Sequence, residues 1–118
     1  MAKLLLHIAL FFGLLLAPVL GWTDFQAGID AYYHGDYLIA QKEIRPLAEQ
    51  GHSGAQLLLG LMYWSGRGVA DDYVLAHMWL SLAASQGEET AWVYLVKLAK
   101  SMTPYQYNTP QILDHRIR

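Results

Sequence analysis

The chain has 118 residues, which is room for one domain, and a domain of this size buries only about 60 to 70% of its unfolded surface. It contains no cysteine, which excludes a disulfide framework, a thiolate zinc site and a lipid-attachment cysteine. Eight lysine and arginine residues stand against ten aspartate and glutamate residues without long runs of one sign, so no nucleic acid is expected as a partner.

Residues 1–21 have the pattern of a signal peptide. Lys3 precedes an apolar run from Leu4 to Ala17, and "APVLG" supplies the small residues that a signal peptidase needs. We expect cleavage after Gly21, which removes Lys3 and leaves seven basic and ten acidic side chains, a formal charge of −3. The alternative is an uncleaved anchor, because the 17 residues Leu4–Leu20 are at the short end of the roughly 17 to 25 that span a bilayer. In both cases the rest of the chain is exported, and we expect a periplasmic or secreted protein.

The rest of the chain is predicted to be helical, with no strand. Its apolar residues recur at spacings of three and four, and "TDFQ" at Thr23–Gln26 and "SGAQ" at Ser53–Gln56 fit a capping box at a helix start. Thr103 begins the same pattern, but Pro110 is expected to interrupt the helix that follows it. The predicted helices are 24–34, 37–50, 53–65, 72–86 and 88–101, with weak helical content beyond 104.

Two copies of one unit are visible in this helical region. "LAEQG" ends at Gly51 and "LAASQG" ends at Gly87, 36 residues later, and Asp36 recurs at the same offset as Asp72. Each aspartate is expected to cap a second helix, and each glycine is expected to end that helix in the left-handed conformation. Upstream of the aspartates the best offset is 32 rather than 36, so the second unit carries four extra residues within "SGRGVADD".

The second unit contains Ala55, Leu59-Gly60, Tyr63, "GRGV", "DDY", Ala76, Trp79 and "LAASQG". In this pattern the unit resembles the Sel-one-like repeat, a relative of the tetratricopeptide repeat. The resemblance implies an all-α superhelix, a tetratricopeptide-like solenoid of about two and a half helix pairs. It also implies a scaffold or adaptor of the bacterial envelope, without catalysis and without a cofactor. The pattern extends over residues 24–107, which gives a repeat domain at 22–107 and a C-terminal tail at 108–118, and leaves open what caps the last repeat.

Three patterns suggest chemistry but are better explained as structure. "GRG" follows a helix, and two aspartates beside it would repel a phosphate, so we interpret it as a hinge with glycines at positive φ and with Asp71 or Asp72 as a cap. "GHSGA" lacks the last glycine of a serine nucleophile elbow. His34, His52, His77 and His115 have no metal-ligand spacing, so no metal is expected.

Apolar and basic residues on the first helix of each unit form the candidate binding surface. They recur at i, i+4 and i+7, and the geometry that the resemblance implies would place them on the concave face. Such a surface would suit a peptide or helix with an apolar face and an acidic end. The alternative is that most of these residues are core, since apolar stripes on helices usually face inward. The candidates are Phe25, Ile29, Tyr32, Leu57, Leu61, Trp64, Val93 and Lys97, with Lys100 next in the series.

The sequence therefore predicts an exported, non-enzymatic interaction module with a protein or peptide partner. One alternative is a membrane-anchored envelope assembly subunit, with membrane contact only if residues 1–21 are retained. An envelope hydrolase is less favoured, because we find no converging titratable groups. Since the array is near the minimum of about three units, its last apolar helix is expected to need the tail or a second copy of the chain as a cover.

Overall fold

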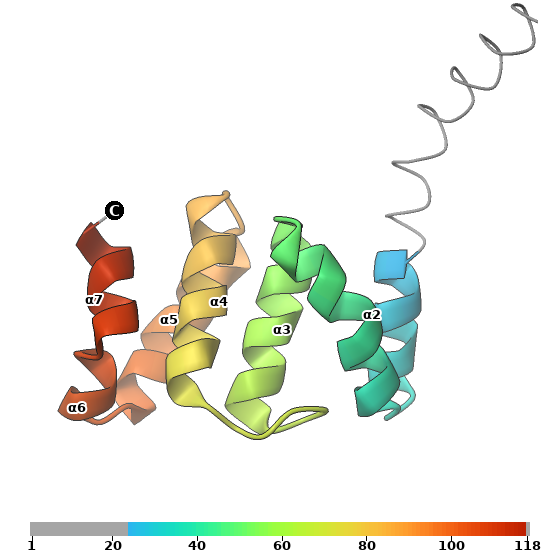
Figure 1. Ribbon diagram of the computed structural model, residues 1–118, viewed down its shortest axis with the longest axis horizontal. Helices are drawn as coiled ribbons and strands as arrows, with labels where there is room; N and C mark the ends of the chain where they lie inside the picture. Colours follow the sequence, from blue (N-terminus) through green and yellow to red (C-terminus); the bar gives the residue numbers. More distant parts are fainter. Residues whose placement is uncertain (1–23, 118) are drawn as a thin grey trace, which may run out of the picture.

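The structure, a computed structural model, describes residues 24–117, and within that range the chain is helical without a strand (Figure 1). The five predicted helices are confirmed with ends that shift by at most one or two residues. The predicted signal peptide or anchor lies outside the described residues. The helices are residues 24–33, then α2 Tyr37–Glu49, α3 Ser53–Ser65, α4 Tyr73–Ser85, α5 Glu89–Ser101, α6 Pro104–Tyr107 and α7 Pro110–Ile117.

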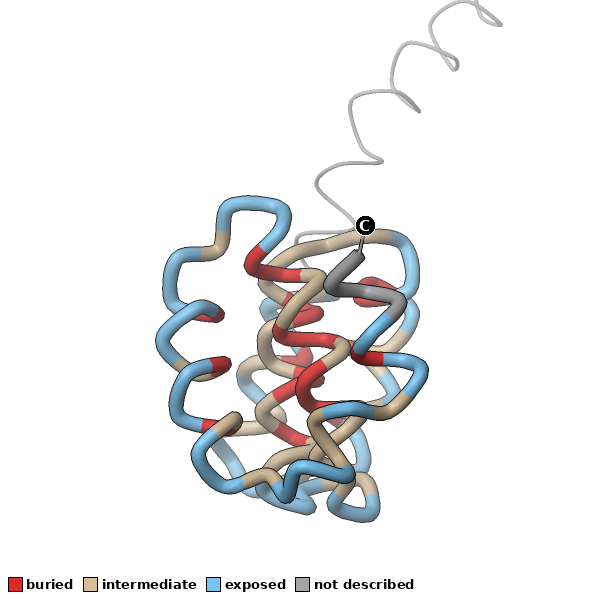
Figure 2. The backbone as a smooth tube through the Cα atoms, turned by 90° about the vertical axis from the view of Figure 1, so that its left-hand side faces the viewer, coloured by how far each residue is buried: buried red, intermediate tan, exposed pale blue. Residues whose placement is uncertain are grey.

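From the helix 24–33 to α5, each helix packs against the next one along the chain. α3 contacts α2 and α4, and α4 also contacts α5, so the helices follow one another in a row along the long axis of Figure 1, with α5 lying behind α4 in that view. α6 and α7 pack against α4, beside α5. The row leaves one side of α5 open, as its pale outer edge shows at the left of Figure 2.

The glycine ends of α2 and α4 are as predicted, whereas the aspartate caps differ from each other. Gly51 and Gly87 have φ of +97° and +96°. Asp72 has an extended backbone, and its carboxylate accepts a 3.0 Å hydrogen bond from the Leu75 amide. Asp36 precedes α2 with ψ of 63°, and its side chain makes no capping hydrogen bond. The predicted side-chain cap at Asp36 is therefore wrong, because the backbone there lacks the extended geometry that aims a capping oxygen.

The predicted capping box at Ser53–Gln56 is also wrong. The N-cap of α3 is His52, whose Nδ1 accepts a 3.0 Å hydrogen bond from the amide of Ala55. Ser53 is the first helical residue, and its hydroxyl donates to Glu88 Oε1 at 3.1 Å. The box predicted at Thr23 begins outside the described residues. The box at Thr103 is confirmed, with its hydroxyl and the Gln106 side chain both in place.

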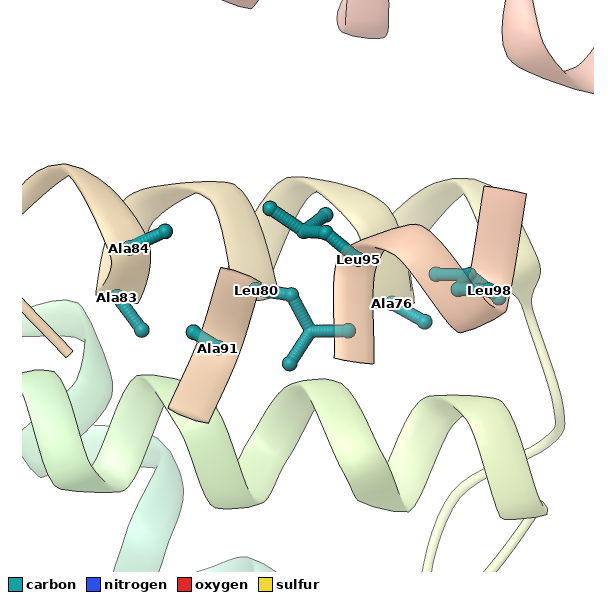
Figure 3. Close-up of a cluster of buried hydrophobic side chains, with 7 residues drawn as sticks. All are labelled: Ala76, Leu80, Ala83, Ala84, Ala91, Leu95 and Leu98. Carbon is teal, nitrogen blue, oxygen red and sulfur yellow. The ribbon is translucent and has the colours of Figure 1, made fainter. Parts of the chain in front are cut away.

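Two clusters of buried side chains hold the row of helices together. The first lies between α2, α3 and α4 and consists of Ile44, Leu47, Ala48, Ala55, Leu59 and Trp79. The second consists of Ala76, Leu80, Ala83, Ala84, Ala91, Leu95 and Leu98, and Figure 3 shows it between α4 and α5, beside α3. α4 supplies residues to both clusters, which explains why its sequence is apolar nearly all round.

Equivalent positions of the two units, 32 residues apart before the aspartates and 36 residues apart after them, have similar surroundings. A methyl group added at Gly28 would lie 2.6 Å from Ile44 Cδ1, and one added at Gly60 would lie 2.8 Å from Leu80 Cγ. Each glycine therefore lets the first helix of its pair approach the second closely. The buried equivalents are Ala40 and Ala76, Ile44 and Leu80, Ala48 and Ala84, Ala55 and Ala91, and Leu59 and Leu95.

Two glutamines connect α2, α3 and α4 where α2 and α4 end and α3 begins. Gln56, buried on α3, donates from Nε2 to the Ala48 carbonyl on α2 at 3.1 Å. Gln86, at the end of α4, donates from Nε2 to Gln56 Oε1 at 2.6 Å. The side-chain amide of Gln56 is thus satisfied at both its oxygen and its nitrogen inside the protein.

The C-terminal segment is more helical than the sequence predicts. Pro110 does not merely interrupt a helix; it is the first residue of α7, where the missing amide hydrogen of proline costs nothing. Ile112 on this helix is fully buried, and α7 packs against α4. The prediction of weak helical content is therefore wrong for Pro110–Ile117.

Candidate functional site

Of the eight candidate residues, four pack against the buried clusters. Ile29 and Tyr32 are half-buried, and Val93 and Lys97 are exposed. Leu57, Leu61 and Trp64 on α3 are half-buried and pack against the second cluster. Phe25 packs against the first cluster. These four residues contribute part of their surface to the core, and only their outer parts are available to a partner.

On the helix 24–33, the candidates Ile29 and Tyr32 are half-buried, and Tyr32 has different aromatic neighbours from Phe25. The ring of Phe25 lies 4.3 Å from the ring of His52, centroid to centroid, which ties this helix to the start of α3. Ile29 is half-buried. Tyr32 belongs to a separate aromatic group with Tyr33 and Tyr37, at centroid distances of 6.0 and 5.2 Å.

A second aromatic group joins α3 to α5. Trp64 and Tyr94 meet edge to face, with their ring centroids 6.3 Å apart. The ammonium nitrogen of Lys97 lies 5.7 Å from the centroid of Tyr94, within the range of a cation–π contact. Trp64 and Tyr94 are half-buried and Lys97 is exposed, so this group presents aromatic surface with a positive charge at its edge.

The turn between α3 and α4 folds back over the first unit. Arg67 donates a 3.1 Å hydrogen bond to the Tyr32 hydroxyl, and its guanidinium carbon lies 5.9 and 5.3 Å from the ring centroids of Tyr32 and Tyr37. The hydrogen bond to Tyr32 raises the pKa of Arg67, and electrostatic interaction with Tyr32 and Tyr37 adds to this effect. Arg67 therefore stays charged and occupies the space beside both tyrosines.

The "GRG" segment has the backbone conformation that was expected for a turn between two helices. Gly66 and Gly68 have φ of +70° and +77°, as the sequence predicts, and Asp72 is the cap of the next helix. A shallow depression of about 400 Å³ lies nearby, lined by Asp71, Asp72, Tyr73 and Gln106. One carboxylate oxygen of Asp72 accepts a hydrogen bond from the Leu75 amide. The neighbouring Asp71 does not by itself complete a general acid–base pair with a defined position for a substrate.

The remaining patterns with possible chemistry have structural partners. Ser53 donates to Glu88, and Ser81 lies 3.2 Å from His77 Nδ1 on the same helix. Among the side chains that the structure describes, residues 24–113, no group of three or more histidine, aspartate or glutamate side chains is placed to hold a metal ion. Over the same range no helix is both long and apolar enough to cross a membrane.

The outer side of α5 exposes large apolar side chains that the candidate row does not include, apart from Val93. Trp92, Val93 and Val96 are 59%, 53% and 57% exposed. The opposite side of the helix buries Ala91, Leu95 and Leu98. Exposed apolar side chains that cluster in this way mark interaction surfaces more often than isolated ones do.

The sequence pattern missed Arg67, Tyr94, Trp92 and Val96. The role of Arg67 depends on a contact with Tyr32, 35 residues away, and no local spacing signals it. Trp92 and Val96, by contrast, stand four residues apart on α5, the last helix of the repeat pattern that the sequence predicts, and that position could have identified them. A helix without a following unit has no neighbour to cover one of its sides.

The structure thus defines the described part of the chain as an all-α protein of packed helices, with an aromatic group between α3 and α5 and lysines on α5. Comparison with known proteins adds no relative, since no family model, no curated protein and no solved structure matches this chain.

Proposed function

We propose that this protein is a non-enzymatic interaction module of the bacterial envelope, a tetratricopeptide-like solenoid that binds a protein or peptide partner. The resemblance of the second unit to the Sel-one-like repeat supports the solenoid. The shared burial of residues 36 apart and the equivalent glycine contacts at Gly28 and Gly60 support it as well. A periplasmic or secreted location follows from the signal-peptide pattern of residues 1–21.

The observation that carries the proposal is the aromatic group of Trp64, Tyr94 and Lys97. It offers two ring surfaces and one cation within a short distance on the first helices of successive units. A partner that places an apolar side chain on these rings and a carboxylate near Lys97 would satisfy both parts. We therefore propose a peptide or helix with an apolar face and an acidic residue beside it.

A peptide-display selection with the exported protein as bait tests this function. The retained peptides should be rich in apolar residues flanked by aspartate or glutamate. Trp64→Ala should weaken their binding by about 2 kcal/mol, roughly thirtyfold, which is typical of a tryptophan at the centre of an interface. Tyr33→Ala is the matched control, because Tyr33 is an aromatic residue that is 82% exposed and lies outside this group.

Two results of the binding measurements would contradict the proposal. One is that the wild-type protein selects no peptide with this pattern. The other is that Trp64→Ala binds the selected peptides as well as Tyr33→Ala does. Circular dichroism must show both variants folded; loss of the helical signal in Trp64→Ala would mean that Trp64 is core and that the surface assignment is wrong.

A further inference from the structure

The outer face of α5 has no neighbour among the described residues. Its three central apolar side chains, Trp92, Val93 and Val96, are each more than half exposed. The following helices α6 and α7 pack against α4 instead of closing over this face. In Figure 2 the side of α5 that points away from the rest of the protein is pale blue along its length, while its buried positions point inward.

The two ends of this face carry opposite charges. Glu89 is in the first turn of α5 and Lys100 is in the last turn. Both are exposed, and neither has a partner within the described part of the chain. At about 100° per residue, Glu89, Lys100 and the three apolar residues lie on one side of the helix.

This arrangement is complementary to itself when one copy is reversed. In an antiparallel pair of α5 helices centred between positions 94 and 95, Glu89 faces Lys100 of the other copy. Val93 faces Val96, and Trp92 lies along the methylene stem of Lys97. The two-fold axis repeats each contact, so the pair has two Glu–Lys contacts around one apolar centre.

We propose that two copies of this chain associate through α5 in this antiparallel orientation. The second copy supplies the cover that the incomplete array lacks, and it buries the largest apolar side chains exposed on α5. A foreign partner would need its own reversed order of acidic, apolar and basic residues, whereas a second copy has that order by symmetry. The association uses the side of α5 that carries Trp92 and Val96, whereas the peptide surface is centred on Trp64 and Tyr94; Lys97 belongs to both surfaces.

A charge-reversal series tests the orientation. The full chain is expressed, and the protein is purified as the cell processes it, with or without residues 1–21. Its association is then measured by sedimentation over a range of concentrations. Glu89→Lys and Lys100→Glu each turn both Glu–Lys contacts into like-charge contacts, so each variant alone should dissociate about tenfold more readily. An equimolar mixture of the two variants should recover the wild-type association, because every cross-copy contact is again between opposite charges.

Two further variants complete the series. Val96→Glu places a charge in the apolar centre and should abolish association while circular dichroism shows a folded protein. Glu49→Lys makes the same chemical change as Glu89→Lys at an exposed position of α2 and should leave association unchanged.

The proposal is overturned if the wild-type protein is monomeric at every concentration, or if the mixture associates no better than its two components. An equal effect of Glu49→Lys and Glu89→Lys would also overturn it, since the effect would then come from net charge. Peptide binding measured on the same samples separates the two proposals. A monomer that binds the selected peptides removes only the association, and a dimer that binds none removes only the proposed function.

Discussion

Replacing Gly68 by alanine should destabilise the protein more than the same change at any of the open glycine turns. Gly68 has φ of +77°, a conformation that costs a residue with a side chain roughly 1 to 2 kcal/mol. In addition, the new methyl group would overlap the carbonyl oxygen of Tyr37, and it would lie 2.9 Å from both the carbonyl carbon of Tyr37 and Met62 Cε. Because the carbonyl belongs to the first residue of α2, the turn can make room only by moving away from that helix.

Gly87→Ala is the matched comparison. Gly87 has φ of +96°, so it carries the same conformational cost, but nothing lies within 4 Å of an added methyl group. Its expected loss is about 1 to 2 kcal/mol. Overpacking adds typically 1 to 3 kcal/mol at Gly68, so the two variants should differ by about 2 kcal/mol.

Thermal unfolding followed by circular dichroism measures this difference. A loss of 1 kcal/mol lowers the melting temperature of a domain of this size by about 4 to 8 °C. Gly68→Ala should therefore melt roughly 8 to 16 °C below Gly87→Ala. If the two variants melt within about 2 °C of each other, the packing of the turn against Tyr37 contributes nothing, and the reasoning is refuted.

Three further substitutions test the fold at other points, each measured by urea unfolding. Gly60→Ala should cost about 1 to 3 kcal/mol, because its methyl group would press on Leu80 Cγ; an unchanged midpoint would show that the helices can separate there freely. Ile112→Ala should cost about 2 to 5 kcal/mol, since the side chain is fully buried; a negligible loss would show that α7 does not belong to the folded unit. His52→Ala should cost about 1 kcal/mol through the lost cap, and a smaller loss than for Ser53→Ala would favour the serine as the cap after all.

The helices could be predicted from the sequence because their ends carry local signals. Gly51, Gly87, Asp72 and Thr103 act on the backbone within a few residues, and each has the expected role. The errors also have local causes. His52 precedes a serine that looks like a better cap, and Pro110 can either end a helix or begin one.

The candidate surface could be predicted only in part. Helical spacing correctly selects residues that share one side of a helix, but it does not say which neighbour covers that side. Leu57 and Leu61 therefore joined the candidate row although they pack against the second cluster, while Tyr94 was missed although it contacts Trp64. Arg67 was missed because its tyrosine partners belong to another unit, and only the folded chain brings them together.

The chain of amides from Ala48 through Gln56 to Gln86 has a consequence for how uniquely the helices are oriented. Aliphatic side chains tolerate small rotations and sliding of one helix on another, because their contacts have no preferred direction. A buried amide that both donates and accepts tolerates neither, since a displaced helix would strand a polar atom away from water. Gln56→Leu could thus preserve the free energy of unfolding and yet let α2, α3 and α4 adopt several alignments. These alignments would appear as broadened amide resonances in NMR spectra.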